Sequence, residues 1–152
     1  CMCFGPLAER FSNDRQHFSP DVIIIDAGRN DPPSDATHQA IDNYFAAVRA
    51  AWPKATIVDI IPYFVTSTTP SKLTPWLTAA AVRNHATIED PFSRGWAGYS
   101  VSGGQAGPDH VHPTADGYRY IAEHLTADFR AMGLPAADAS AGHPAVSLAS
   151  PS

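Results

Sequence analysis

Two short strings in the sequence combine residue types that ester chemistry needs. The first is Asp109-x-x-His112, in which a histidine follows a carboxylate by three positions. Hydrolysis by an activated hydroxyl needs a general base with a pKa near neutrality, and histidine is the usual choice. Its imidazole must be held in one tautomer by an acceptor on the other ring nitrogen, which Asp109 can supply. The string, followed by Pro113, predicts an acid–base pair on a tight loop before a helix.

The second string is Gly28-x-Asn30-Asp31. A tetrahedral oxyanion needs preorganised N–H donors, and the side-chain amide of Asn30 is one suitable kind. Gly28 lets backbone and substrate approach closely, and Arg29 is placed to touch an anionic substrate. These three residues are therefore candidates for binding an acyl group.

Each string also has a purely structural interpretation. Glycine, asparagine and aspartate are favoured in any turn after a strand, and Arg29 is then a solvated loop cation. Asp109 could cap a helix and leave His112 on the surface, because Asp-x-x-His is a common string. Taken singly, neither string decides between the two interpretations.

Other reactive residues make weaker candidates. The serines outside the helix cap do not sit on the kind of strand-to-helix turn that exposes a nucleophile, and Cys3 has no such surroundings either; these serines are Ser12, Ser19, Ser67, Ser71, Ser93, Ser100 and Ser102. His110 and His112 with a nearby acid resemble part of a zinc site, but a third ligand at suitable spacing is absent. We therefore predict no metal. Four aromatic residues could line a substrate pocket or simply pack: Trp76, Phe92, Trp96 and Tyr99.

The elements that must position these loops can be read from hydrophobic periodicity. Short apolar runs rich in β-branched residues predict strands, and apolar stripes at helical spacing predict helices. The predicted strands cover residues 21–27, 56–61 and 86–90, and the predicted helices cover residues 6–18, 35–52, 71–85 and 114–132. Ser34 should cap the second helix. Alternating strands and helices predict an α/β domain with a parallel sheet, whose first strand, Val22–Ile25, should be buried on both faces.

Composition restricts the class of protein. A chain of 152 residues with 44% hydrophobic residues suits one domain, which we place at residues 1–132. Residues 133–152 are rich in Ala, Pro and Ser and should form a disordered tail. The net charge of −5, without a basic stripe, argues against nucleic-acid binding, and no apolar run is long enough for a transmembrane segment. The acidic charge and the tail suit a secreted protein; Cys1 and Cys3 are too close together for an ordinary mutual disulfide.

Together the two strings resemble the SGNH hydrolases, also called GDSL-type lipases and esterases. Gly28, Asn30 and Asp31 match the third conserved block of that family. The fifth block is matched by Asp109, His112, Pro113, Gly117 and Tyr118. The resemblance covers residues 5–132 and implies a three-layer α/β/α sandwich of the flavodoxin-like type. It also implies ester hydrolysis without a metal or organic cofactor.

By the same resemblance, His112 would be the general base, Asp109 would orient it, and Asn30 would be an oxyanion donor. Gly5, ahead of the first predicted helix, could be the second-block glycine whose N–H is a further donor. The expected partner is a small-molecule, glycan or lipid ester.

One block of the family is absent. No Gly-Asp-Ser string, which supplies the nucleophile, occurs in the sequence, and the 27 residues before Gly28 are too few for the strands and helix around it. We therefore expect a chain that lacks its N-terminal strands and is nearly inactive alone, with the serine supplied by a missing segment or another chain that completes the sheet. Two alternatives stay open: an acyltransferase using the same site, and a non-catalytic binding domain that has lost its nucleophile.

Overall fold

A computed structural model describes residues 4–63, 69–98 and 104–134 of the chain. Of the predicted tail at 133–152, residues 135–152 lie outside the described residues. The helices are α1 (Phe4–His17), α2 (Asp35–Ala51), α3 (Thr74–Arg83) and α4 (Ala115–Ala131). The strands are β1 (Val22–Ile25), β2 (Thr56–Ile60) and β3 (Thr87–Glu89). Every element predicted from the sequence is present, although α1 begins two residues earlier and α3 three residues later than predicted.

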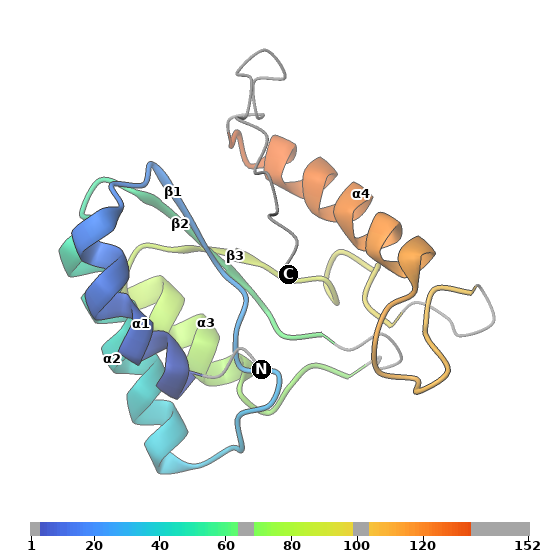
Figure 1. Cartoon of the computed structure of the whole chain (residues 1–152), viewed down its shortest axis with the longest axis horizontal. Coiled ribbons are helices and arrows are strands. Elements are labelled where there is room, and N and C mark those ends of the chain that lie inside the picture. The colour runs from blue at the N-terminus through green and yellow to red at the C-terminus, as the bar shows by residue number, and fades with distance from the viewer. Residues whose placement is uncertain (1–3, 64–68, 99–103, 135–152) are drawn as a thin grey trace, which may run out of the picture.

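The three strands form a parallel sheet in the order β1-β2-β3. Ile23 lies opposite Ile57, and Val58 of β2 lies opposite Thr87 of β3. Helices α1, α2 and α3 lie on one side of the sheet, and α4 lies on the other (Figure 1). The predicted three-layer α/β/α arrangement with a parallel sheet is therefore confirmed.

The main core lies between the sheet and the first three helices. Ser34 is the N-cap of helix α2, as predicted from the sequence, and its Oγ accepts a hydrogen bond from the Thr37 backbone N–H. The apolar stripe of α2 packs on the strands because residues three and four apart share one helix face. The fully buried aliphatic and aromatic residues of this core include Phe4, Ile25, Ile41, Phe45, Val48, Ile57, Ile61, Leu73 and Leu77.

Strand β1 corrects one prediction. It was expected to be buried on both faces, but Ile24 is 49% exposed. Among the described residues β1 pairs only with β2, so its other edge is open. In addition, the residues of α4 pack around Ile60 of β2 and Trp96 rather than over β1.

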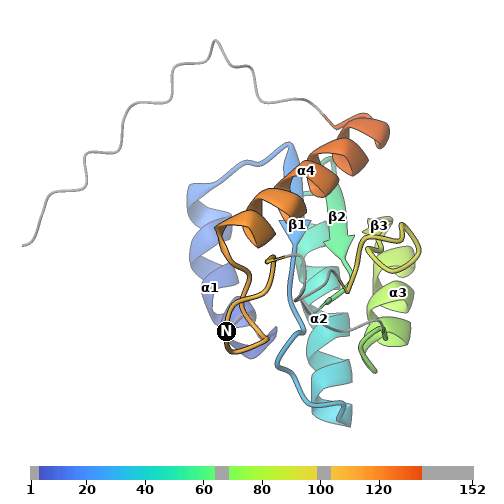
Figure 2. The same cartoon turned by 90° about the vertical axis from the view of Figure 1, so that its right-hand side faces the viewer.

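Helix α4 is attached to the rest of the domain through a second, smaller cluster. Buried Ile60, Tyr63 and Trp96 meet partly buried side chains of α4, among them Ile121 and Leu125. Figure 2 shows α4 crossing in front of β1 and β2. Within the described residues, no helix combines the length and apolar character needed to cross a bilayer.

Candidate active site

Asp109 and His112 form a direct pair. The Nδ1 atom of His112 lies 2.6 Å from Oδ2 of Asp109. The second carboxylate oxygen, Oδ1, accepts hydrogen bonds of 3.0 Å from the backbone N–H groups of Val111 and His112. Both side chains are exposed, at 76% for His112 and 52% for Asp109. The pair is thus accessible from solvent, and the carboxylate is oriented by the backbone that follows it.

The loop that carries the pair is closed at its base by backbone contacts. The N–H of Gly107 donates to the carbonyl of His112 over 2.7 Å, and Ala106 forms an antiparallel bridge with Pro113. Below this bridge, the Thr114 N–H donates to the Gln105 carbonyl over 2.9 Å. These contacts hold residues 105–114 as a narrow loop with the Asp–His pair near its tip.

The first turn of α4 anchors this loop. Thr114 is the N-cap, and its Oγ1 accepts from the Gly117 N–H at 3.1 Å and donates to the Gly104 carbonyl at 2.6 Å. A Cβ at Gly117 would lie 2.0 Å from the Gln105 carbonyl oxygen and 2.9 Å from the Cβ of Pro113. Only glycine allows this close approach. The sequence alone could not show why a glycine is needed at position 117, because the need arises from contact with Gln105, twelve positions earlier in the chain.

The electrostatics of the pair favour an ionised carboxylate. Hydrogen bonding to His112, and then to the backbone N–H groups of His112 and Val111, lowers the pKa of Asp109 well below its ordinary value. The carboxylate therefore accepts from Nδ1–H of His112, which leaves Nε2 as the basic nitrogen. His110, which lies between Asp109 and His112 in the chain, adopts a positive φ of 57°. An asparagine or glycine would tolerate this backbone conformation more readily.

The loop after β1 is shaped by Gly28. Its φ is 93°, a region that side chains rarely adopt. A Cβ at this position would also lie 3.3 Å from Pro62 Cγ and 3.5 Å from both Leu73 Cδ1 and Phe4 Cε2. Gly28 is buried, whereas Asn30 two residues later is exposed. The loop therefore turns on a packed glycine and presents the Asn30 residue to solvent.

Arg29, between these two, is held by protein groups. Its guanidinium lies 3.3 Å from both carboxylate oxygens of Asp26. The same guanidinium lies over the ring of Tyr63, with Cζ 4.5 Å from the ring centroid. Contact with an anionic substrate remains a prediction for Arg29.

Gly5 lies in the first turn of α1 rather than ahead of it. The preceding residue, Phe4, donates its backbone N–H to Oδ2 of Asp31 over 3.3 Å. This bond lowers the pKa of Asp31, but burial is the larger influence and raises it overall. N–H groups in a first helical turn have no intrahelical partner. The start of α1, and with it Gly5, is thereby brought next to the Gly28–Asp31 loop.

The two loops lie at the same end of the sheet. Residues 26–34 leave the carboxyl end of β1, and residues 104–114 lie toward that end in both views (Figures 1 and 2). Ligands of open α/β sheets bind outside the carboxyl ends of the strands. The arrangement agrees with a shared site at this end of the sheet.

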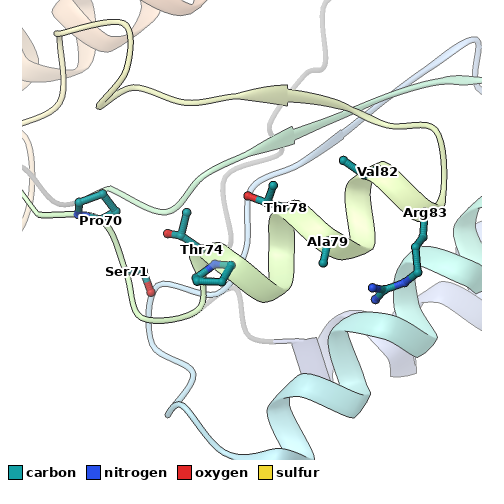
Figure 3. Close-up of a pocket in the computed structure, with 8 residues that line it drawn as sticks. Pro70, Ser71, Thr74, Thr78, Ala79, Val82 and Arg83 are labelled. Carbon is teal, nitrogen blue, oxygen red and sulfur yellow. The ribbon is translucent and has the colours of Figure 1, made fainter.

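One hollow in the described surface lies away from these loops. It has a volume of about 670 Å³ and runs along α3 and the segment before it. Figure 3 shows Pro70, Ser71 and Thr74 at one end and Val82 and Arg83 at the other. None of the predicted site residues lines it.

The remaining sequence candidates are placed as follows. Trp96 is buried, and Trp76 and Phe92 are partly buried against the cores, so packing accounts for all three. Tyr99 lies outside the described residues. His124 of α4 stacks on Trp96. Among the described residues, no three His, Cys, Asp or Glu side chains converge as a metal site.

Comparison with known proteins agrees with this architecture. A comparison with curated protein sequences finds no match. A solved structure of a peptidoglycan O-acetylesterase is similar at 24% identity, with a TM-score of 0.65 over 82% of this chain. The chain spans only 41% of that protein's length. A structure from Lactobacillus plantarum is similar at 16% identity, with a TM-score of 0.57 over 73% of this chain and 67% of the other.

The model of the GDSL-like lipase/acylhydrolase family matches residues 5–120. That range includes the start of α1, the Gly28–Asp31 loop and the Asp109–His112 pair. Since the match extends over most of the chain, the chain belongs to the GDSL-like lipase/acylhydrolase family.

Proposed function

We propose that this chain provides the acid–base half of a serine ester hydrolase. His112 is the general base, Asp109 holds it in one tautomer, and Asn30 stabilises the oxyanion. The observation that carries the proposal is the 2.6 Å contact between Nδ1 of His112 and Oδ2 of Asp109, with the ring exposed. This is the geometry that a serine-activating histidine requires.

The nucleophile in this proposal comes from outside the 152 residues, because no Gly-Asp-Ser string occurs among them. The open edge of β1 supports this view. Val22–Ile25 is an all-apolar run of the kind found in strands with neighbours on both sides, yet its outer edge has no partner among the described residues. A strand followed by a turn that bears the serine could pair there and complete the sheet.

The reaction then follows from the residues in order. The serine oxygen attacks the acyl carbonyl while Nε2 of His112 takes its proton. The oxyanion forms near the Asn30 amide, with the backbone N–H of Gly5 or Gly28 as a further donor. The intermediate collapses, His112 gives its proton to the leaving alcohol, and a water activated by His112 releases the acid and restores the serine.

The test begins with the DNA upstream of codon 1. An in-frame segment that encodes Gly-Asp-Ser should convert the inactive chain into an enzyme that cleaves p-nitrophenyl acetate. In that longer protein, His112→Ala should lower kcat by roughly 10³-fold or more, and Asn30→Ala by roughly 10²-fold. His110→Asn is the matched control, because it removes an imidazole two residues away and tolerates the positive φ.

Retained activity in His112→Ala would remove that residue from the mechanism. A start codon near Cys1, with no activity in any form of the protein, would instead favour the non-catalytic binding domain. Addition of an alcohol acceptor separates hydrolysis from acyl transfer, because a transferase would form a new ester rather than free acid.

A further inference from the structure

A row of side chains links the loop of Asn30 to helix α4. It starts at Arg29, whose guanidinium lies over the ring of Tyr63. The Tyr63 ring meets the Trp96 indole edge to face, with centroids 5.1 Å apart and planes at 73°. The indole in turn stacks on His124 of α4 at 5.3 Å and 14°. Four segments of the chain thus meet in one continuous contact.

Trp96 is the centre of this row. It is only 3% exposed, and its Nε1 donates to Oδ2 of Asp128 over 2.9 Å. The hydroxyl of Tyr120 donates to the Trp96 backbone carbonyl over 3.3 Å. Three residues spread over more than two turns of α4 therefore contact one tryptophan, two of them at its indole and Tyr120 at its backbone carbonyl: Tyr120, His124 and Asp128.

Helix α4 depends strongly on this contact. Every residue of α4 is described, and Gly117 is its only buried one. Ile121, Leu125 and Phe129 of α4 pack in the same cluster as Trp96, and the first-turn contact with Gln105 joins the loop of His112 to the helix. The loop is therefore joined to the first turn of the helix, and Trp96 lies in the cluster where α4 meets Ile60 of the sheet.

We infer that Tyr63 and Trp96 are positioning residues, which set the place of the His112 loop relative to the loop of Asn30. Aromatic pairs with centroids 4.5–7 Å apart have preferred geometries, and buried rings have few rotamers. Such a pair is a stiff spacer. A displacement of about 1 Å at the reacting groups can cost about 10²-fold in rate. The catalytic meaning of this inference rests on the proposed function, whereas the coupling between the loops does not.

The coupling can be measured by hydrogen exchange and mass spectrometry on the 152-residue chain. Trp96→Phe should speed amide exchange in residues 26–31 and 104–131 by roughly three- to tenfold, because it removes the indole hydrogen bond to Asp128 and part of the ring contact with Tyr63 and His124. Trp76→Phe is the matched control, because Trp76 also stacks on a histidine, His38, at 4.7 Å and 9°, but on the α2–α3 side. It should leave both segments unchanged.

A second pair of variants tests the indole hydrogen bond. Asp128→Asn keeps an acceptor for the Trp96 N–H and should restore most of the protection that Asp128→Ala loses. The inference is wrong if Trp96→Phe leaves residues 26–31 unchanged, or if Trp76→Phe has the same effect as Trp96→Phe.

The positioning role is then tested in the longer, active protein. Trp96→Phe should lower kcat for p-nitrophenyl acetate several-fold and change KM less, whereas Trp76→Phe should change neither. Faster exchange with an unchanged kcat would overturn the positioning role. If no form of the protein hydrolyses esters, the exchange result still stands, so failure of the proposed function and failure of the coupling are distinguishable.

Discussion

Position 117 needs a glycine because there is no room for a Cβ atom, and not because of its backbone conformation. A methyl group there would overlap the Gln105 carbonyl, and that carbonyl belongs to the base of the loop that carries the Asp–His pair. The residue therefore acts on the candidate site without touching it, by allowing the loop to lie against the first turn of α4.

Gly117→Ala should lower the free energy of unfolding by about 1–3 kcal/mol, as overpacking usually does. Gly5→Ala is the matched control, because it also lies in a first helical turn but its Cβ would meet nothing within 4 Å. It should be neutral or stabilising by about 0.5 kcal/mol. Urea unfolding of both variants measures the difference, and equal effects would show that the contact with Gln105 is not tight.

Asp59 on β2 predicts a pH dependence of stability. It is fully buried, and neither carboxyl oxygen has a hydrogen-bond partner in the described part of the chain. Burial, and then the nearby Asp26 carboxylate, raise the pKa of Asp59 to about 7. The folded state therefore favours the neutral acid, and this group destabilises the fold progressively as pH rises from about 4 to about 7.

Asp59→Asn should consequently raise the free energy of unfolding at pH 8 by at least about 1 kcal/mol and change it little at pH 4. Asp109→Asn should have the opposite sign, because the pKa of Asp109 is lowered and its ionised form stabilises the fold above pH 4. Urea unfolding across this range measures both. A gain for Asp59→Asn that is independent of pH would contradict the ionisation argument.

At the scale of elements, the starts of α2 and α4 are each capped by a hydroxyl side chain. Ser34 and Thr114 both accept from the backbone N–H three residues on. The Thr114 hydroxyl also donates a hydrogen bond to the Gly104 carbonyl. One residue therefore caps α4 and closes the loop of the Asp–His pair.

Thr114→Ala should destabilise the protein by about 1–2 kcal/mol and also speed amide exchange in residues 104–112, because cap and loop contact are lost together. Ser34→Ala, the matched control, should cost a comparable cap energy without affecting that segment. Thr114→Ser should restore both bonds. Faster exchange at 104–112 in Ser34→Ala as well would show that the effect is global.

Much of this arrangement was predictable from local sequence. The β-branched run at 22–25 identified a strand, Ser34 located the start of α2 and Pro113 that of α4, and Asp109-x-x-His112 identified two residues that are in contact. These features depend on residues close in the chain. The stacking of His124 on Trp96 and the exposure of Ile24 depend on packing between distant segments. Periodicity alone therefore predicted the burial of Ile24 wrongly and could not predict the stacking.

At the scale of the whole molecule, the open edge of β1 is the most consequential surface. An unpaired strand edge is a template for another strand, and β1 has no charged residue to prevent such pairing. The half-exposed Ile24 adds an apolar contact beside it. We expect the 152-residue chain alone to associate through this edge as its concentration rises.

Ile24→Lys should therefore shift the chain toward the monomer in sedimentation velocity experiments. Val82→Lys is the matched control, because Val82 is an exposed apolar residue on α3, at 64% exposure. It should leave the association unchanged. A chain that stays monomeric without either substitution would show that the edge does not recruit a second copy.

The narrow loop of residues 105–114 has a consequence for how the protein assembles. Its contacts join residues no more than about twelve positions apart, so the entropy lost in closing it is small and closure is fast. The imidazole and carboxylate can thus be preformed before any serine arrives. A split version of the protein, mixed from two separately made pieces, would then need to dock the segment that carries the serine against an Asp–His pair that is already formed.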